Sequence, residues 1–313
     1  MRGYVANTDE DWLEFLRSQP PLDEVNFWQP SGGRAFHAIG PGSPFFFKLK
    51  SPHNAVAGFG IFVRQAQLPA WLAWETFGLR NGAPDFETMR RRIEKYRGSV
   101  QGVGGPAGSY IVGCLLVSEP VLFPREAWIP QPSDYRRQIV QGKTYDLLTG
   151  EGRMLWDACL ERARSVSLGD ALPALVAESA RYGSPRTVRP RLGQGTFRVA
   201  VTDAYGRACA VTSEQSLPAL DAAHIMPYAV GGAHEVCNGI LLRRDIHRLF
   251  DLGYVTVDST TRCFEVSRRL REEWDNGRVY YEMRGRQLRE PAALDDRPSK
   301  PFLDWHNSEV FLQ

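Results

Sequence analysis

The spacing of apolar residues in the first half of the chain predicts a strand-rich domain. Apolar runs and apolar–polar alternation, bounded by turns rich in glycine and proline, indicate strands at residues 3–6, 25–28, 45–50, 55–63 and 110–117. Helical periodicity predicts helices from residue 12 and over 69–77 and 85–96, the last with the acidic start and basic end that the helix dipole favours. We therefore expect an α+β fold with a small closed or bent sheet and helices on one side.

The second half of the chain has a different pattern. The amphipathic stretch 152–163 predicts a connecting helix, and residues 182–194, with two prolines and three arginines, predict a hinge. The expected divisions are a first domain at 1–150, a helical linker at 151–192, a second domain at 193–275 and a C-terminal extension at 276–313, with a strand at 279–283.

Composition excludes several classes of protein. With 43% hydrophobic and 24% charged residues, the 313-residue chain is neither disordered, collagen-like nor a coiled coil. It contains no run of about 18 apolar residues, and its N-terminus turns acidic before a signal peptide could form, so we expect a cytoplasmic protein without a membrane partner. The five widely spaced cysteines form no CxxC pair, which predicts reduced thiols and no structural zinc site.

The basic residues are unevenly divided between two types. The net charge is only +2, but just five of the 38 basic residues are lysines. Arginine suits phosphate and base edges, although a GC-rich genome is the simpler explanation of the bias. Near-neutral net charge does not exclude DNA binding, because local patches decide it.

An ordered set of residues between positions 221 and 251 carries the strongest chemical signal. The chain reads AAHI-x-P around His224, then Gly231-Gly232, then NGI-x-L from Asn238, then D-x-H-R-x-F-D around His247. This set resembles the HNH, or ββα-metal, nuclease family, and is most similar to the modules of modification-dependent restriction enzymes. The resemblance spans about residues 195–270.

The same residues favour this fold on physical grounds. Residues 221–225 have strand character, and Pro227 with Gly231-Gly232 can turn the chain into a hairpin. Apolar positions between 240 and 250 predict a helix with one buried stripe. This arrangement puts His224 and His247 on facing elements, and a neutral imidazole is a suitable base for a water molecule at neutral pH.

The resemblance also implies a role for each residue. His224 would be the general base, Asn238 would brace the loop and help to orient His224, and His247 would ligate a divalent metal ion, Mg²⁺ first and Mn²⁺, Ni²⁺ or Zn²⁺ as alternatives. The family often has a ligand directly before the base, where this chain has Ala223. Two carboxylates are candidates to replace that ligand: Asp221, on the same strand face as Ala223, and Asp251, one helical turn after His247.

Other polar residues near the motif have two interpretations. Arg243, Arg244 and Arg248 are placed to contact phosphates beside the scissile bond, or they form a solvated face. The remaining histidines, His37, His53, His234 and His306, have no motif support, so we expect them to be structural or at the surface.

The first domain resembles, more distantly, the PUA, ASCH and SRA barrels that read modified bases. The pattern that carries this resemblance is NFWQP, a turn, FFFKLK, GFGIFV and then AW…FG. Such domains flip a base out of the duplex and stack it on aromatic side chains. The candidates for stacking or lining a base pocket are Trp28, Phe47, Phe59, Trp71, Trp74 and Tyr145, with packing in the core as the alternative for each.

Together, these expectations predict a metal-dependent DNA endonuclease that is directed to modified DNA. Because each chain has one small site, cutting of both strands would favour a homodimer. One alternative keeps the nuclease but lets the first domain bind unmodified nucleic acid or a signal nucleotide. Another is a non-catalytic nucleic-acid-binding protein with a decayed HNH fold, which Ala223 keeps open.

Overall fold

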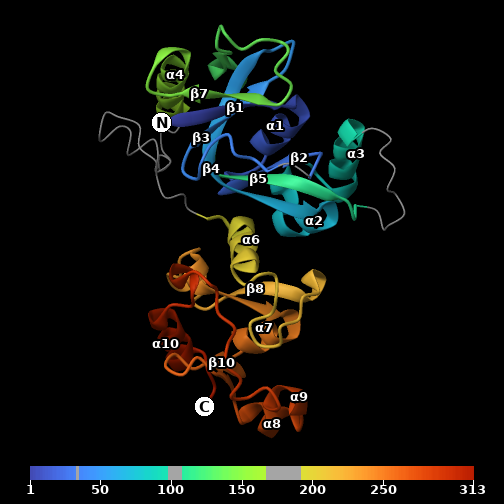
Figure 1. Ribbon diagram of the computed structural model, residues 1–313, viewed down its shortest axis with the longest axis vertical. Helices are drawn as coiled ribbons and strands as arrows, with labels where there is room; N and C mark the ends of the chain where they lie inside the picture. Colours follow the sequence, from blue (N-terminus) through green and yellow to red (C-terminus); the bar gives the residue numbers. More distant parts are fainter. Residues whose placement is uncertain (33–34, 98–107, 167–191) are drawn as a thin grey trace. The chain divides into compact units, whose positions relative to one another are not determined.

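The computed structural model describes residues 1–32, 35–97, 108–166 and 192–313 (Figure 1). The chain divides into two compact units, Met1–Gly193 and Gln194–Gln313. The predicted hinge at 182–194 lies, up to residue 191, outside the described residues. None of the described helices is long and apolar enough to cross a membrane.

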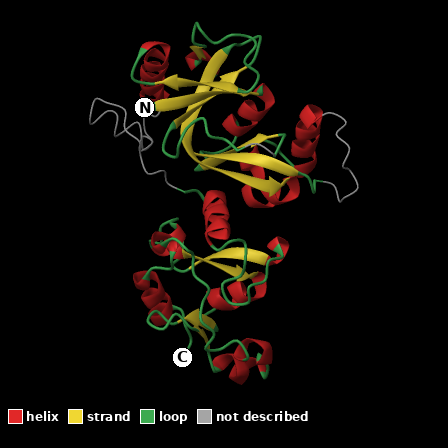
Figure 2. Ribbon diagram, in the orientation of Figure 1, coloured by secondary structure: helices red, strands yellow, loops and turns green. Residues whose placement is uncertain are grey.

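The first unit is built on a seven-stranded sheet (Figure 2). Its order is β2-β5-β4-β3-β1-β7, and β6 pairs with β4. The strands are β1 (Arg2–Thr8), β2 (Glu24–Gln29), β3 (Pro44–Leu49), β4 (Ala55–Pro69), β5 (Ile111–Leu122), β6 (Ile129–Pro130) and β7 (Gly142–Asp146). The α-helices described in this unit are α1 (Glu10–Arg17), α2 (Ala70–Phe77), α3 (Phe86–Arg97) and α4 (Gly150–Val166).

The expected α+β class is confirmed, but the described strands do not close into a barrel. Strands β2 and β7 are the two ends of the strand order, and no pairing between them is formed in the described part of the chain. The long strand β4 has register shifts at Phe59/Ile61 and Phe62/Arg64 against β5. Such shifts bend and twist a strand, so the sheet is curved and remains open.

Helix α4, expected to be a linker, contributes to the core of the first unit. Its buried face includes Trp156 and Cys159, which pack with Phe46 and Phe59 of the sheet. The Trp156 ring meets both phenylalanines edge-on, at centroid distances of 5.9 and 5.4 Å. Because this apolar stripe covers one face of the sheet, the first unit extends past residue 150.

The second unit contains two small hairpins and several short helices. Its elements are α6 (Gln194–Ala204), β8 (Leu220–His224), β9 (Gly239–Arg243), α7 (Arg244–Asp251), β10 (Val255–Val257), β11 (Phe264–Val266), α8 (Arg269–Trp274), α9 (Arg278–Tyr281) and α10 (Lys300–Glu309). Antiparallel pairing joins β8 to β9 and β10 to β11.

Two local predictions in this unit were wrong. Residues 240–242, predicted as the start of a helix, belong to strand β9, because three consecutive apolar residues can be buried in a strand that is covered on both faces. A strand was predicted at 279–283, but residues 279–281 belong to helix α9.

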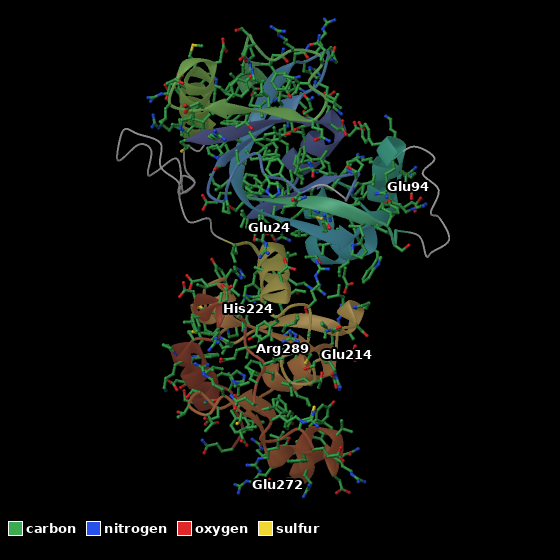
Figure 3. The ribbon with its side chains drawn as sticks, in the orientation of Figure 1. Glu24, Glu94, Glu214, His224, Glu272 and Arg289 are labelled. Carbon is green, nitrogen blue, oxygen red and sulfur yellow. The ribbon has the colours of Figure 1, made fainter. Side chains whose placement is uncertain are left out.

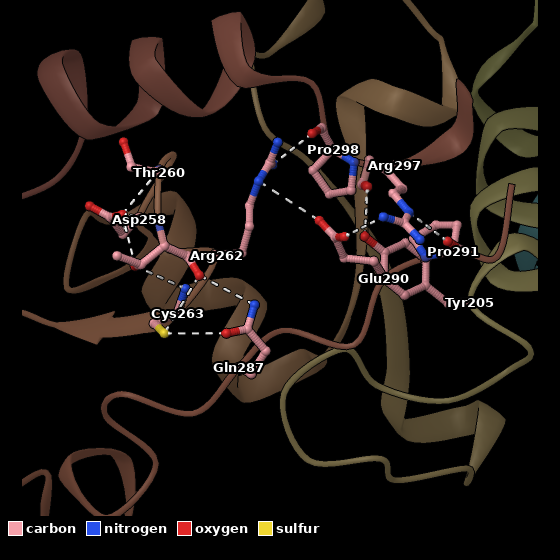
Figure 4. A network of polar contacts seen from close by, with 12 residues as sticks. Tyr205, Asp258, Thr260, Arg262, Cys263, Gln287, Glu290, Pro291, Arg297 and Pro298 are labelled. Carbon is pink, nitrogen blue, oxygen red and sulfur yellow. Dashed lines mark hydrogen bonds and ion pairs between the residues drawn. The ribbon is translucent and has the colours of Figure 1, made fainter. Parts of the chain in front are cut away.

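The C-terminal extension is packed against the rest of the second unit. The His306 ring on α10 stacks on Phe250 of α7 with a centroid distance of 3.7 Å. Its Nδ1 forms a hydrogen bond with Oγ1 of Thr256 on β10 at 2.8 Å. A polar network also ties the extension to the turn after β10, where Arg262 donates to the carbonyl of Pro298 at 2.7 Å and pairs with Glu290 at 3.8 Å (Figure 4). The extension is therefore part of the core that supports α7.

Helix α7 ends in a turn that only glycine can make without strain. Gly253 has φ of 77°, its N–H donates to Phe250, and the N–H of Tyr254 donates to Leu249, which is the pattern of a glycine C-cap. A Cβ atom on Gly253 would lie 2.0 Å from the carbonyl oxygen of Val310. This glycine therefore lets the extension approach the end of α7.

We predict that Gly253→Ala lowers the free energy of unfolding of the second unit by more than the roughly 1 kcal/mol that a left-handed backbone alone costs an alanine. The matched control is Gly285→Ala, since Gly285 has φ of 79° but no atom within 4 Å of the added Cβ. Urea denaturation of both variants measures the difference. Equal losses would mean that the contact with Val310 is not a constraint.

Candidate active site

The site is assembled where the β8–β9 hairpin meets helix α7. His224 is the last residue of β8 and is labelled in Figure 3, Asp221 lies three residues earlier on the same strand, and His247 projects from α7. The structure therefore brings together the two elements that the motif predicted to face each other.

His247 is held between two carboxylates. Its Nδ1 lies 3.2 Å from Oδ2 of Asp221, and its Nε2 lies 3.4 Å from Oδ2 of Asp251. Although burial opposes protonation, the hydrogen bonds and charges of Asp221 and Asp251 raise the pKa of His247 to about 9. His247 is thus an imidazolium at neutral pH in this arrangement.

Asp221 contacts two positively charged side chains, His247 and Arg198. Burial by itself would raise the pKa of Asp221, but the hydrogen bond with His247 and the charge of Arg198, whose Nε lies 3.6 Å away, outweigh it and lower the pKa. Asp221 is therefore an anionic group at neutral pH, in contact with both α6 and α7.

His224 has the opposite electrostatic environment. Its ring stacks on Phe197 of α6 with a centroid distance of 3.8 Å and an interplanar angle of 12°, and its Nε2 lies 2.9 Å from Nδ1 of His234. Burial, followed by electrostatic interactions with His234 and His247, lowers the pKa of His224 to about 4. His224 is therefore neutral at neutral pH, which is the state that a general base needs.

Asn238 is fully buried and closes the loop between β8 and β9. Its side-chain oxygen accepts from the N–H of Met226 at 2.9 Å, and its amide nitrogen donates to the carbonyls of Met226 and Ala233, both at 2.9 Å. The loop therefore leaves the end of β8 in one fixed direction, which fixes the position of His224. This geometry fits the bracing role that the resemblance implied for Asn238.

The three arginines beside the motif differ in their surroundings. Arg243 forms an ion pair with Asp245, with Nε 3.0 Å from Oδ1. Arg244 and Arg248 are exposed on α7, and the charge of Arg244 acts on Asp221. Arg244 and Arg248 therefore lie at the surface of α7, and Arg243 is held by a carboxylate of the same helix.

Sequence reasoning missed three residues at this site. His234 was expected to be structural or at the surface, whereas its ring contacts His224 directly. Phe197 and Arg198 lie at the start of the stretch 195–270 that resembles the HNH family but carried no motif letter, and they reach the site from α6. Their distance in sequence from residues 221–251 explains why spacing could not reveal them.

The donor groups around His247 suit a divalent cation in their chemistry. One imidazole and two carboxylates offer nitrogen and oxygen ligands, and each carboxylate has an oxygen within 3.4 Å of a nitrogen of the His247 ring. Among the described residues, however, no group of three or more histidine, cysteine, aspartate or glutamate side chains is arranged to hold a metal ion. Both nitrogens of His247 face carboxylates, so a metal ion would have to replace the proton that now joins them.

The first unit contains a pocket with a volume of about 540 Å³, which is in the range of small-molecule sites. Its lining combines aromatic, aliphatic and polar side chains: Tyr4, Asn7, Thr8, Asp9, Trp12, Phe27, Trp28, Gln29, Pro30, Ser31, Lys50, Tyr96, Arg97, Leu115, Val140 and Gln141. Asp9 is the centre of a polar group on this wall, where Oδ1 accepts from Lys50 at 2.6 Å and from the Tyr96 hydroxyl at 2.8 Å.

Six aromatic residues were predicted to line a base pocket. Trp28 lines the pocket described here and the other five do not. Phe47 and Phe59 are fully buried in the core, and Tyr145 is 5% exposed with its hydroxyl on Asp134. Trp71 and Trp74 are half-buried on α2, away from the lining. Phe47 and Phe59 do not reach this pocket because both faces of β3 and β4 are covered, so aromatic residues there fill the core.

Comparisons with known proteins agree with the interpretation of the second unit. Residues 209–258, which contain β8, β9 and α7, match the family model described as HNH endonuclease. This segment is of the HNH type. The resemblance inferred from the motif is therefore confirmed for this part of the chain.

Two solved structures are similar to the chain at low identity. ASCH from Zymomonas mobilis is 12% identical, and the match covers 50% of this chain and 94% of that chain, with a TM-score of 0.32. The modification-dependent TagI restriction endonuclease is 12% identical, and the match covers 98% of this chain and 81% of that chain, with a TM-score of 0.29. No curated protein matches the chain.

We predict that the second unit is most stable near pH 6.5 and loses stability on both sides. Burial lowers the pKa of His306 and of His224 to about 4, so below about pH 6.5 the unfolded chain binds protons that the folded unit does not. The raised pKa of His247 has the opposite effect, because its stabilising proton is lost as the pH rises toward 9.

His306 allows a test of the loss of stability below pH 6.5, since its side chain is only 2% exposed. One such group contributes a slope of at most about 1.4 kcal/mol per pH unit. His306→Phe keeps a ring on Phe250 and should make the decline from pH 6.5 to 5 shallower. Hydrogen exchange of the amides in β10, corrected for intrinsic rates, measures this, and an unchanged slope would show that His306 is not the group responsible.

Proposed function

We propose that this protein is a metal-dependent DNA endonuclease in which His224 is the general base. The observation that carries this proposal is the neutral His224 at the end of β8, the strand that also carries the partner of His247, Asp221, within a segment that matches the HNH endonuclease family. Phosphodiester hydrolysis needs a base for water and a positive site for the phosphate, and these two groups of residues would supply them.

Each of the protein's own residues at the site would have a defined role in hydrolysis. His224, stacked on Phe197, would accept the proton of a water molecule that attacks the phosphorus atom. Arg244 and Arg248 would contact phosphates on either side of the scissile bond. His247, with Asp221 and Asp251, would hold a divalent cation, Mg²⁺ first and Mn²⁺, Ni²⁺ or Zn²⁺ as alternatives. The bound cation supplies stabilisation of the charge on the phosphate and on the leaving oxygen.

We further propose that the pocket of the first unit takes a modified base flipped out of DNA. Its volume and its combination of aromatic rings with the polar group around Asp9 support a planar, hydrogen-bonding ligand. Binding of unmodified nucleic acid or of a signal nucleotide is the alternative use of the same pocket. Cutting of both strands by one small site per chain would require two copies of the protein.

We expect His224→Ala to reduce DNA cleavage by about 100-fold or more, the usual contribution of a general base, while DNA binding is retained. Cleavage should also stop with a chelator and return with excess divalent ion. A gel-based cleavage assay and a binding assay on the same samples measure both. The matched control is His37→Ala, since His37 lies in the other unit. Full activity of His224→Ala would reject His224 as the base, and an inactive wild-type protein would favour a decayed HNH fold.

The base-reading proposal predicts faster cleavage of DNA that carries one type of base modification. Ser31→Trp, which places a ring in the pocket, should reduce this preference toward the rate on unmodified DNA. Ser165→Trp is the control, because Ser165 is exposed on α4 and does not line the pocket. A cleavage panel of modified and unmodified duplexes measures the ratio. Equal cutting of all duplexes by the wild type would remove the base-reading role.

A further inference from the structure

A second histidine contacts the residue that we propose as the base. His234 lies in the loop between β8 and β9, and its Nδ1 is 2.9 Å from Nε2 of His224. We propose that His234 is a positioning residue, which keeps the proton of His224 on Nε2 and leaves Nδ1 of His224 as the basic atom. This inference rests on the proposed function, in which His224 is the general base.

The contact belongs to an ordered set of rings. His224 stacks on Phe197 at 3.8 Å, and His234 stacks on Tyr228 at 4.8 Å with an interplanar angle of 7°. The two histidine rings meet at 65°, so that a nitrogen of one points to a nitrogen of the other. Each imidazole is therefore fixed by a stacking partner of its own and by the hydrogen bond between them, which limits rotation of both rings.

The direction of this hydrogen bond decides the chemistry. If His224 donates from Nε2, then Nδ1 of His224 carries a lone pair and can accept the proton of water. If His234 donates instead, neutral His224 carries its proton on Nδ1, and the lone pair of Nε2 is occupied by the hydrogen bond from His234 and does not face water. In the part of the chain that the structure describes, no hydrogen bond to Nδ1 of His224 is formed. This atom is thus the one left to meet a water molecule.

The buried amide of Asn238 holds the loop that carries His234. Asn238 donates to the carbonyl of Ala233, the residue directly before His234, and to that of Met226, two residues after His224. Both histidines therefore lie close to backbone atoms that one side chain ties together. The hydrogen bonds of Asn238 thus hold the backbone next to both His224 and His234.

Two substitutions of His234 separate positioning from packing. His234→Asn places an oxygen at the same δ position, where it can accept the proton of Nε2. His234→Phe keeps a ring to stack on Tyr228 but has no acceptor. We expect kcat of His234→Phe to fall by about 10- to 100-fold, as loss of a group that orients a reacting side chain usually causes. KM should remain unchanged, and His234→Asn should restore most of kcat.

Equal loss of kcat in both variants, or no loss in His234→Phe, would overturn the proposal. Thermal unfolding of each variant checks that it is folded. Parallel loss of divalent-ion binding in His234→Phe, measured by calorimetry with Mn²⁺, would also overturn it, because His234 would then be part of a metal site.

A direct measurement on the wild-type protein does not depend on any variant. The ¹⁵N shifts of the His224 ring show which nitrogen carries the proton, and we expect the Nε2–H form. The Nδ1–H form would refute the inference even if the variants fail to fold. Failure of the proposed function is distinguishable, since His224→Ala would then leave cleavage unchanged, whereas failure of this inference alone leaves His224 essential and His234 replaceable by Phe.

Discussion

The site in the second unit depends on the buried side chain of Asn238. Its amide satisfies both backbone groups of Met226 and the carbonyl of Ala233, so a loop of irregular backbone is held without loss of hydrogen bonds. The backbone carbonyl of Asn238 also accepts from Ile225, directly after His224. Because one buried residue ties the end of β8 to the start of β9, the position of His224 follows from the fold of the hairpin.

The two imidazoles of the site are driven to opposite charge states by their surroundings. His224, which faces Phe197 and His234, is neutral, whereas His247, between Asp221 and Asp251, is protonated. Burial acts in the same direction on both, so the carboxylates make the difference. Separation of two like groups in this way is how a site obtains a base and a cationic partner from the same type of residue.

In the first unit, the aromatic residues that line the pocket are mostly not those that the sequence pattern predicted. The aromatic run 45–47 is buried, and Phe47 packs against Trp12 and Phe27, which in turn line the pocket. Phe47 lies on β3, a central strand that is covered on both faces. Trp28 lies near the end of the edge strand β2, where its side chain lines the pocket. The polar group of Asp9, Lys50 and Tyr96 joins three segments far apart in sequence, so no local pattern could have revealed it.

The sequence by itself determined the HNH-type segment and the relation of His224, Asn238 and His247. His224 ends β8, Asn238 lies directly before β9, and His247 lies on α7, so all three belong to one local hairpin–helix unit, in which spacing along the chain is closely related to position. Only the tertiary structure decided that β9 precedes α7, that Phe197 and Arg198 reach the site from α6, and that His234 contacts His224. These contacts are made between side chains of separate elements, and such packing depends on the whole fold and leaves no periodic trace in the chain.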